Sequence, residues 1–515
     1  MSMRAVIDVA TEAAFEGSAN YAGGLGVLIA DKFYTAGRIG LPYILVVPFY
    51  PNGYVDWDSM NRVRYIETRH RHSLSFLSKL SYIGSIEARS GSGRLIAEAD
   101  LYEYIHGSAK AILYRVSRPL TTARLFRYLY RHHRDECTYY IGAAAISSEI
   151  VKRIASSIEI SIVDIQEAHL ALTPYLLPKN IRVRFVTHTP GPWGHPKICR
   201  EAEELLDISL PAVETMTEAA MEISENVFTV SRKHFEITRT LFPKYANKLS
   251  YVTNAIDIER WQRVKNIQGD AESFSKIHQD LKREFSMVVQ TLSGKKIGDR
   301  MIISWCRRIT RYKRPYFIEW FLEENTDLKD AAFIVVSGKP HPNDEWGREQ
   351  AQLFAKFSRV IPNFYFHPSY GMEFAYYALS GSDLLLFTPF SCWEASGTSM
   401  MKAGVNGVPT LSSRDGASLE LIEDGVNGWL FGEELKEFID IERNARASEL
   451  DEKDYRDFLK KLLDIIDLYN SDRGKFTEVA YRAYKTFTPY VDMKRLLKQY
   501  YPEFVESRKA NNSIE

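Results

Sequence analysis

Short apolar runs alternate with amphipathic stretches along most of the chain. Such alternation is typical of parallel sheets crossed by helices. Several runs end in short polar or glycine-containing turns, where doubly wound sheets place their ligand-binding groups. The pattern therefore predicts an α/β fold. The runs that we interpret as strands are RAVIDVA, YILVVPFY, SIVDIQ, RVRFVTH, NVFTVS, KLSYVTN, RMIISWC, AAFIVVSG and DLLLFTP.

The strands fall into two series, which predicts two domains. With 515 residues the chain is too long for a single hydrophobic core. The break lies near Asn254 to Trp261, and a charged helical segment at about residues 271–290 precedes the second series. We predict Rossmann-like domains at residues 1–255 and 256–478, facing a cleft, and a helix within 479–515 that crosses back and ends in a frayed tail.

Composition excludes several function classes. Hydrophobic residues make up 45% and charged residues 26%, as in ordinary globular proteins. Lys plus Arg and Asp plus Glu balance at 66 each, so the bulk charge attracts neither nucleic acid nor an anionic membrane. The N-terminus lacks a signal-peptide pattern, and no apolar run reaches membrane-spanning length. We expect a soluble, cytoplasmic protein.

The four cysteines are scattered along the chain, with no CxxC pair. This spacing indicates neither a disulfide framework nor a zinc site, and a reducing compartment fits it best. We therefore predict no bound metal. The cysteines are Cys137, Cys199, Cys306 and Cys392.

A glycine-rich turn follows the first predicted strand and leads into an amphipathic helix. Its glycines are Gly23, Gly24 and Gly26. Glycine lets the backbone approach a ligand closely, and the start of a helix offers unpaired N–H groups to phosphate. Alone, the motif equally fits a tight turn that packs the helix on the strand.

A dense basic run, WCRRITRYKRP, lies directly behind the apolar run MIIS. Cations at a helix N-terminus oppose the helix dipole, so they need a compensating anion. A turn at this place could bring Arg308 and Lys313 together on a phosphate. The alternative is a charged helix start that faces water.

The segment EASGTSMMK follows a strand and a short loop and then enters a helix. Its small residues and the Thr398 hydroxyl can bind phosphate at the helix start. Lys402 would then lie one turn into the helix. A lysine sheltered there could bond covalently to a carbonyl group, whereas a bare lysine near a helix start is usually solvated.

At these residues the sequence resembles the α-glucan phosphorylases, a pyridoxal phosphate family with the two-Rossmann glycosyltransferase (GT-B) fold. Similar patches occur in the family's order from about Tyr21 to Gly432, and the last two are the most specific. They are YAGGLGVLIADKFYTAGRIGLPYILVVPFYPNGY, VDIQEAH, VTHTPGPWGH, VFTVSRKH, VTNAIDIERW, SWCRRITRYKRP, VVSGKPHPNDEWG, PSYGMEFAYYALSGSDLLLFTP and EASGTSMMKAGVNGVPTLSSRDGASLELIED.

The resemblance implies roles for single residues. Lys402 matches the lysine that holds pyridoxal 5′-phosphate, and Arg308 and Lys313 match the basic residues that grip the phosphates. These three are the predicted catalytic residues. Further predicted cofactor contacts are Thr398, Ser399, Tyr370 and Gly24, and predicted substrate contacts are His188, Asn254, Tyr312, Glu394, Ser396, Gly397 and Gly23.

The implied activity is release of α-glucose 1-phosphate from the ends of glycogen, starch or maltodextrin with inorganic phosphate. In the family the cofactor's phosphate exchanges a proton with the substrate phosphate, and configuration at C1 is retained. The resemblance leaves room for a homo-oligomer. The chain departs from the family in its short length, in lacking a match to the acidic gating loop, and in Met400, whose bulk could narrow the cofactor-phosphate loop.

Two other functions remain open. A glucan synthase that uses a nucleotide sugar shares the fold, but synthases carry a lysine where Tyr21 stands and a second glutamate where this chain has Lys402. A catalytically silent glucan-binding protein would not need Lys402, Arg308 and Lys313 together.

Overall fold

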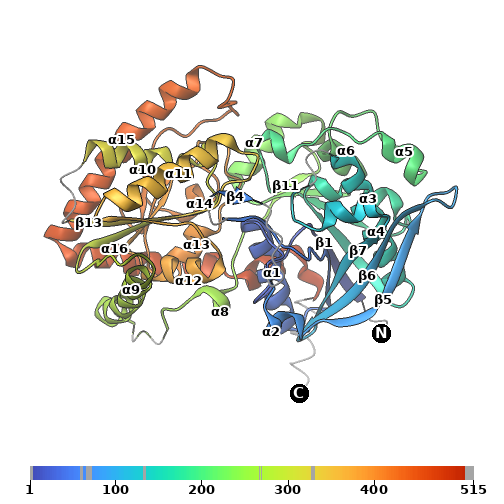
Figure 1. Cartoon of the computed structure of the whole chain (residues 1–515), viewed down its shortest axis with the longest axis horizontal. Helices are drawn as coiled ribbons and strands as arrows, with labels where there is room; N and C mark the ends of the chain where they lie inside the picture. The colour runs from blue at the N-terminus through green and yellow to red at the C-terminus, as the bar shows by residue number, and fades with distance from the viewer. Residues whose placement is uncertain are drawn as a thin grey trace. The chain divides into compact units, whose positions relative to one another are not determined.

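Two compact units make up the protein. The computed structural model describes residues 4–57, 62–64, 72–131, 135–265, 267, 269–325 and 331–504. Each unit is built on its own largely parallel sheet with helices packed against it (Figure 1). The predicted pair of doubly wound α/β domains is confirmed. Unit 1 comprises Met1–Tyr54, Tyr65–Thr253 and Met493–Glu515, and unit 2 comprises Val55–Arg64 and Asn254–Asp492.

The sheet of unit 1 has nine strands in the order β11-β10-β9-β8-β1-β2-β7-β6-β5. From β11 to β7 neighbouring strands run parallel, and β6 and β5 add an antiparallel ribbon at one edge (Figure 1). The strands are β1 (Arg4–Val9), β2 (Tyr43–Pro48), β5 (Ser81–Arg89), β6 (Leu95–His106), β7 (Ala109–Arg118), β8 (Glu159–Gln166), β9 (Val183–Val186), β10 (Asn226–Thr229) and β11 (Leu249–Tyr251).

Amphipathic helices connect the parallel strands of this sheet. Helix α1 begins directly behind the glycine-rich turn, and its residues from Gly26 to Gly37 are buried. The helices of unit 1 are α1 (Gly24–Ile39), α2 (Leu74–Leu77), α3 (Leu120–Ala123), α4 (Glu136–Ala155), α5 (Glu201–Leu206), α6 (Met216–Ile223), α7 (Arg232–Leu241) and α17 (Met493–Tyr500), with short 3₁₀ turns η1 (Arg124–Phe126), η2 (Ala168–Leu170), η3 (Thr173–Leu176), η4 (Pro192–Gly194) and η5 (Pro243–Tyr245).

Unit 2 has a six-stranded parallel sheet in the order β14-β13-β12-β15-β16-β17. The alternate residues Met301, Ile303 and Trp305 of β12 enter one core cluster, as the two-residue period of a strand requires. The strands are β12 (Met301–Cys306), β13 (Ala332–Ser337), β14 (Phe364–His367), β15 (Leu384–Phe387), β16 (Thr410–Ser413) and β17 (Trp429–Phe431); β3 (Asp56–Trp57) and β4 (Val63–Arg64) form a separate antiparallel pair.

Helices also surround the second sheet. Aromatic side chains of α10 and α15 pack with β12 in the core, including Phe317 and Phe458. On the other side α12 packs against α9 and β12, and α13 packs against α12 and α16. The elements are α8 (Ile258–Trp261), α9 (Ala271–Ser293), η6 (Arg311–Lys313), α10 (Tyr316–Glu324), α11 (Glu345–Val360), α12 (Met372–Gly381), α13 (Ser399–Gly404), α14 (Ser418–Leu421), α15 (Arg446–Ser471) and α16 (Arg473–Tyr490).

The C-terminal region differs from the single helix that the sequence predicts. Helices α16 and α17 are separate, with Pro489 near the end of α16. A proline cannot donate the backbone bond that helix continuation needs. Helix α16 belongs to unit 2, and the chain returns to unit 1 only at Met493. The predicted frayed end lies outside the described residues.

The cysteine prediction is wrong in one respect, because Cys137 and Cys199 form a disulfide. The fold brings the start of α4 beside the segment that precedes α5, although 62 residues separate the two cysteines. Such proximity cannot be read from spacing alone. The disulfide also removes the cysteine-based argument for a reducing compartment. Cys306 and Cys392 are buried thiols. Among the described helices, none is long and apolar enough to cross a membrane.

Candidate functional site

The sheet of unit 2 changes its winding direction between β12 and β15. From β12 the chain continues to β13 and β14 on one side, and then returns through β15, β16 and β17 on the other. Ligands of doubly wound folds bind outside the carboxyl ends of the strands at such a switch point. The segments that leave β12 and β15 carry the basic run and the loop before Lys402. The main candidate site therefore lies here.

An ion-paired cluster joins these two segments. The Glu394 carboxylate accepts a hydrogen bond from Arg307 and lies 3.2 Å from Lys313 Nζ. Side-chain exposure is 6% for Arg307 and 12% for both Lys313 and Glu394. Burial alone would raise the pKa of Glu394, but the neighbouring Lys313 and Arg307 outweigh it and the pKa is lowered. Glu394 is therefore ionised, and it meets two cations.

Lys313 has an unusual protonation equilibrium for a lysine. Burial lowers its pKa to about 7, and the positive charges of Arg307 and Arg308 act in the same direction. The carboxylate of Glu394 opposes this shift but does not cancel it. An added anion would favour the charged form of Lys313, so the cluster is suited to bind one.

Asp415 fixes the backbone of the loop that carries Glu394. Its Oδ1 accepts the N–H of Cys392 at 2.8 Å, and its Oδ2 accepts those of Trp393 and Glu394 at 3.1 and 2.7 Å. Burial raises the pKa of Asp415 to about 7, although the backbone N–H bonds lower it in part. Sequence reasoning missed this residue, because its role depends on contacts between segments that lie 21 to 23 residues apart.

The predicted residues of the EASGTSMMK segment form a tight turn into α13. Gly397 has φ +73°, and a Cβ there would lie 2.3 Å from the ring of Phe387, so only glycine fits. Ser396 is buried, and its Oγ has no hydrogen-bond partner among the described residues. Thr398 is the N-cap residue and Ser399 the first residue of the helix. Met400 is fully buried in α13.

Lys402 is buried rather than solvated, with 5% exposure. Its Nζ donates to Thr398 Oγ1 at 3.1 Å and lies 4.3 Å from the centre of the Trp261 ring. Asn406 bonds the carbonyl oxygens of Lys402 and Trp261 at 2.8 and 2.9 Å, which holds α13 against α8. The solvated alternative for Lys402 is therefore excluded.

The other predicted residues of unit 2 occupy neighbouring positions. The ring of Tyr312 stacks on Trp393 with centres 5.8 Å apart. Arg308 is half-buried, and its charge acts on Tyr312 and on Lys313. Tyr370 donates its hydroxyl to the carbonyl of Cys306, the last residue of β12, at 3.0 Å. Asn254 is buried at the start of the unit.

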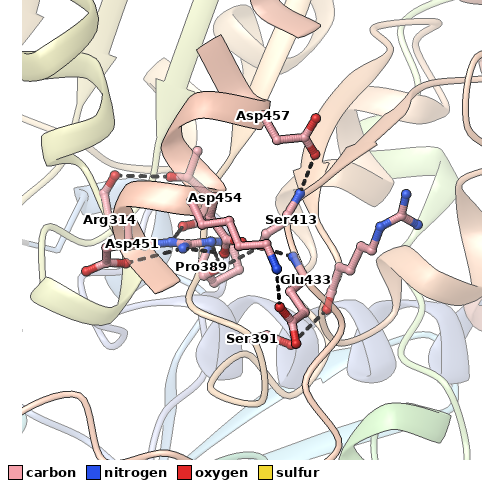
Figure 2. A network of polar contacts seen from close by, with 12 residues as sticks. Arg314, Pro389, Ser391, Ser413, Glu433, Asp451, Asp454 and Asp457 are labelled. Carbon is pink, nitrogen blue, oxygen red and sulfur yellow. Dashed lines mark hydrogen bonds and ion pairs between the residues drawn. The ribbon is translucent and has the colours of Figure 1, made fainter. Parts of the chain in front are cut away.

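Arg314 has a structural role instead of the anion-binding role that the basic run suggests. It is fully buried and donates to Asp454 at 2.7 Å and to the carbonyls of Thr388 and Pro389, both at 2.9 Å (Figure 2). The same network includes Ser413, whose hydroxyl donates to Pro389. Arg314 thus anchors the loop after β15 to helix α15.

Unit 1 contains the other predicted residues. Gly23 is the N-cap residue of α1 and Gly24 its exposed first residue. The Glu12 carboxylate accepts the N–H of Ala22 at 2.5 Å and holds this turn in place. The glycine-rich turn follows β1, which lies next to β8, and this is the corresponding switch point of the first sheet.

His188 follows the end of β9 and is oriented by two partners. Its backbone N–H donates to the Glu167 carboxylate at 3.0 Å, and its ring Nε2 lies 2.8 Å from Gln166 Oε1. Burial, helped by the charge of Lys32, lowers the pKa of His188 to about 3. The imidazole is therefore neutral, and its Nε2 carries the proton that Gln166 accepts.

The donor set of unit 2 fits a phosphate group. Nε and Nη1 of Arg307 are buried and have no hydrogen-bond partner among the described residues, as is also true of Ser396 Oγ. Unpaired buried donors are costly, so such atoms indicate a missing acceptor. Arg307 was recognised in the sequence only as part of the basic run and not as a site residue.

Comparisons with known proteins find carbohydrate phosphorylases. A family model described as carbohydrate phosphorylase matches residues 236–506. The chain is 25% identical to a maltodextrin phosphorylase of Thermococcus litoralis, over 95% of its own length and 69% of that protein. It is 32% identical to a glycogen phosphorylase of Aquifex aeolicus, over 40% of its own length and 30% of that protein.

The fold is also that of a solved glycosyltransferase. The catalytic domain of starch synthase IV from Arabidopsis thaliana, bound to ADP and acarbose, aligns with a TM-score of 0.75 and 14% identity. The alignment covers 98% of this chain and 99% of that one. At this identity the likeness establishes the GT-B fold and not the reaction.

Proposed function

Because the chain belongs to the carbohydrate phosphorylase family, we propose that it is an α-1,4-glucan phosphorylase that depends on pyridoxal 5′-phosphate. Family members are glycosyltransferase-type enzymes. The proposed substrates are inorganic phosphate and the non-reducing end of an α-glucan, and the product is α-glucose 1-phosphate. One observation carries the proposal: a buried lysine, Lys402, follows the buried cluster in which Arg307 and Lys313 meet the single carboxylate of Glu394.

The described residues fit the cofactor. The Lys402 amine would hold its carbonyl carbon, and the Thr398 hydroxyl, Ser399, Tyr370 and Gly24 would bind the rest of the group. When bound, pyridoxal phosphate supplies a phosphate group that can donate and accept a proton. Sheltering of the Lys402 amine by Trp261 favours a covalent bond there, because water competes less well in a buried site.

The substrate phosphate is assigned to Arg308 and Lys313. Both residues are positioned at the carboxyl end of β12, and cations fixed in a site of low dielectric stabilise developing charge without reorganisation. A phosphate oxygen forms the new bond to C1 of the terminal glucosyl residue as the C1–O4 bond breaks. The substrate phosphate donates a proton to the departing O4, and configuration at C1 is retained.

The glucosyl residue is assigned to polar groups whose positions are fixed by their partners. Glu394 is ionised and accepts hydrogen bonds from sugar hydroxyls, while Asp415 keeps its backbone in place. The neutral His188 imidazole suits a sugar hydroxyl better than a phosphate. The remaining assigned contacts are Asn254, Tyr312, Ser396, Gly397 and Gly23.

A synthase that uses a nucleotide sugar is the second candidate, favoured by the fold of the plant starch synthase. The two functions differ in the donor they need. Incubation with ADP-glucose or UDP-glucose and maltoheptaose tests for the synthase. Elongation that is independent of pyridoxal phosphate would replace the proposal with this candidate.

The direct test of the proposal is the release of glucose 1-phosphate from maltoheptaose and inorganic phosphate, with and without added pyridoxal phosphate. The Lys402→Ala variant is expected to retain its fold and to lose at least about 10³-fold in kcat, since catalytic groups act as a unit. Lys436→Ala, at an exposed surface lysine, is the matched control and is expected to keep full activity.

A chemical test locates the cofactor. After borohydride reduction, peptide mass spectrometry of the wild-type protein is expected to show a phosphopyridoxyl mass on Lys402. Full activity of Lys402→Ala, or the absence of any adduct after reconstitution, would contradict the proposal.

A further inference from the structure

One tryptophan of unit 1 is exposed. The side chain of Trp193 is 46% exposed. Among the described residues, it is the one tryptophan in the set of exposed large apolar side chains. Leaving an indole in water forgoes a large hydrophobic gain, because aromatic side chains dominate burial energetics. An exposed aromatic ring on a functional loop is therefore a candidate ligand contact.

The indole is held in place by its loop. Trp193 lies in the 3₁₀ turn η4, in which the N–H of Gly194 donates to the carbonyl of Gly191 at 2.9 Å. A Cβ on Gly191 would lie 2.9 Å from atoms of the indole, so the ring lies against the backbone of the loop. Thr217, fully buried, donates to the Gly194 carbonyl at 3.2 Å. These contacts fix the backbone that carries the indole, so ordering of the loop adds little to the entropy cost of binding a ligand.

The loop leaves the carboxyl end of β9, the edge of the sheet at which doubly wound folds bind ligands. His188 is the second residue after β9, and the Thr189 hydroxyl donates to Glu167 at 2.6 Å. Trp193 is therefore anchored on the same loop as the histidine assigned to the reacting sugar. The loop is short, because only four residues separate His188 and Trp193.

The part of the loop that carries Trp193, residues 188–195, has no charged side chain at neutral pH, and the first cation beyond it is Lys197. Burial lowers the pKa of His188 to about 3 and that of His195 to about 4. The residues between them are Thr, Pro, Gly and Trp. A surface that offers a flat apolar ring and neutral polar groups suits a neutral ligand with one C–H face and a rim of hydroxyls. It offers little to a nucleotide or a free phosphate.

We propose that Trp193 is the stacking platform for a glucosyl residue of the glucan chain, on the acceptor side of the bond that is cleaved. This inference rests on the proposed function and specifies its polymer contacts. The reacting glucosyl residue is bound near His188, and the chain continues outward over the exposed indole. The C–H face of a glucosyl residue packs on the ring, which removes apolar surface of both partners from water.

The binding experiment is calorimetric titration of maltoheptaose into the wild type and four variants. Trp193→Ala is expected to bind about tenfold more weakly than the wild type, and Trp193→Phe, which keeps a flat ring, within about threefold of it. Trp193→Leu keeps apolar bulk without a flat face and is expected to resemble Trp193→Ala. The control, Tyr82→Ala, removes an aromatic ring that is even more exposed (61%) from the edge strand β5 and is expected to bind like the wild type.

The kinetic experiment tests whether Trp193 binds the glucan on the acceptor side of the cleaved bond. In the synthesis direction, Trp193→Ala is expected to raise KM for maltoheptaose about tenfold and to leave KM for glucose 1-phosphate within about twofold. An unchanged glucan affinity and KM in Trp193→Ala, with a near-ultraviolet circular dichroism spectrum that shows intact packing elsewhere, would overturn the proposal. Full rescue by Trp193→Leu would overturn it too, as would a change in oligomeric state by light scattering without a change in glucan binding.

These outcomes are separate from those of the proposed function. If the wild type binds maltoheptaose in a Trp193-dependent way but releases no glucose 1-phosphate, the platform stands and the phosphorylase proposal fails. If phosphorolysis occurs and Trp193 has no effect on glucan affinity, the platform fails and the phosphorylase proposal stands.

Discussion

Burial, together with the positive charges near Glu394, explains why Lys313 titrates near neutrality. Two cations contact one carboxylate in a buried place, so the second cation is only partly compensated. Burial and the charge of Arg307 lower the pKa of Lys313, and the carboxylate of Glu394 does not cancel this shift. Below pH about 7 Lys313 is protonated, and it becomes neutral as the pH rises through this value. Under the proposed function, phosphate affinity is expected to depend on that proton.

The protonation equilibrium of Lys313 predicts that kcat/KM for phosphate declines on the alkaline side of the pH profile. In the wild type, kcat/KM for phosphate is expected to fall as the pH rises above about 7, because the free enzyme loses the charge of Lys313. Lys313→Arg keeps a permanent charge, so the limb is expected to disappear even if the absolute rate falls. Initial rates at a series of pH values, with glucan saturating, measure both. A limb of unchanged position in Lys313→Arg would assign it to another group.

At the scale of elements, two buried groups place the loop after β15. Asp415, at the end of β16, binds three successive N–H groups of the loop. Arg314 binds two carbonyls at its beginning and reaches helix α15 through Asp451 and Asp454 (Figure 2). A loop held at both its donors and its acceptors has little freedom. The proposed contact of Glu394 with the sugar depends on this rigidity.

Asp415→Asn tests the role of the first group. Each carboxylate oxygen accepts at least one N–H, so an amide –NH₂ faces a backbone donor in either orientation. The variant is expected to lose about 1–3 kcal/mol in the free energy of unfolding and to show a lower kcat. Urea denaturation and initial rates measure these two effects. Asp440→Asn, at a half-buried aspartate that accepts one N–H from Glu442, is the matched control.

The same variant has a signature in pH. Burial raises the pKa of Asp415 from 3.8 to about 7, so the folded state holds this proton more tightly than the unfolded state. The stability from that proton is complete below pH 3.8 and is lost as the pH rises through about 7. Between these values the wild type is expected to lose stability relative to Asp415→Asn. A constant difference across the range would contradict the assignment.

At the scale of the whole molecule, the hydrophobic pattern of the sequence and its resemblance to a family predicted different features. Apolar periodicity located the strands that flank both switch points, because buried parallel strands are continuous apolar runs. It missed the half-exposed ribbon of β5 and β6, whose residues alternate weakly. The buried state of Lys402 and the Cys137–Cys199 bond depend on contacts between distant segments. No local pattern encodes such contacts.

The return of the C-terminus to unit 1 also follows from distant contacts. Tyr501 donates its hydroxyl to Asp164 at 2.6 Å and lies 3.3 Å from Asp8. Arg184 makes a two-pronged ion pair with Asp164, at 2.7 and 2.8 Å, and also binds the carbonyl of Tyr500 at 2.9 Å. The carboxylates are fully buried, so they must be satisfied by these partners. Unit 1 therefore needs the last helix for its own core.

Tyr501→Phe in the full chain is expected to destabilise unit 1 selectively. The substitution keeps the ring but leaves Asp164 and Asp8 with one donor fewer in a buried network, which costs about 1–3 kcal/mol. Hydrogen exchange by mass spectrometry is expected to show faster exchange in β1, β8 and α17 and unchanged exchange in β12 to β17. Tyr490→Phe, at an exposed tyrosine of α16, is the control and is expected to change neither set. Equal protection of β1, β8 and α17 in Tyr501→Phe and the wild type would show that the hydroxyl contributes nothing to stability. The C-terminus would then be held by the packing of Lys32 and Arg184 on the Tyr501 ring.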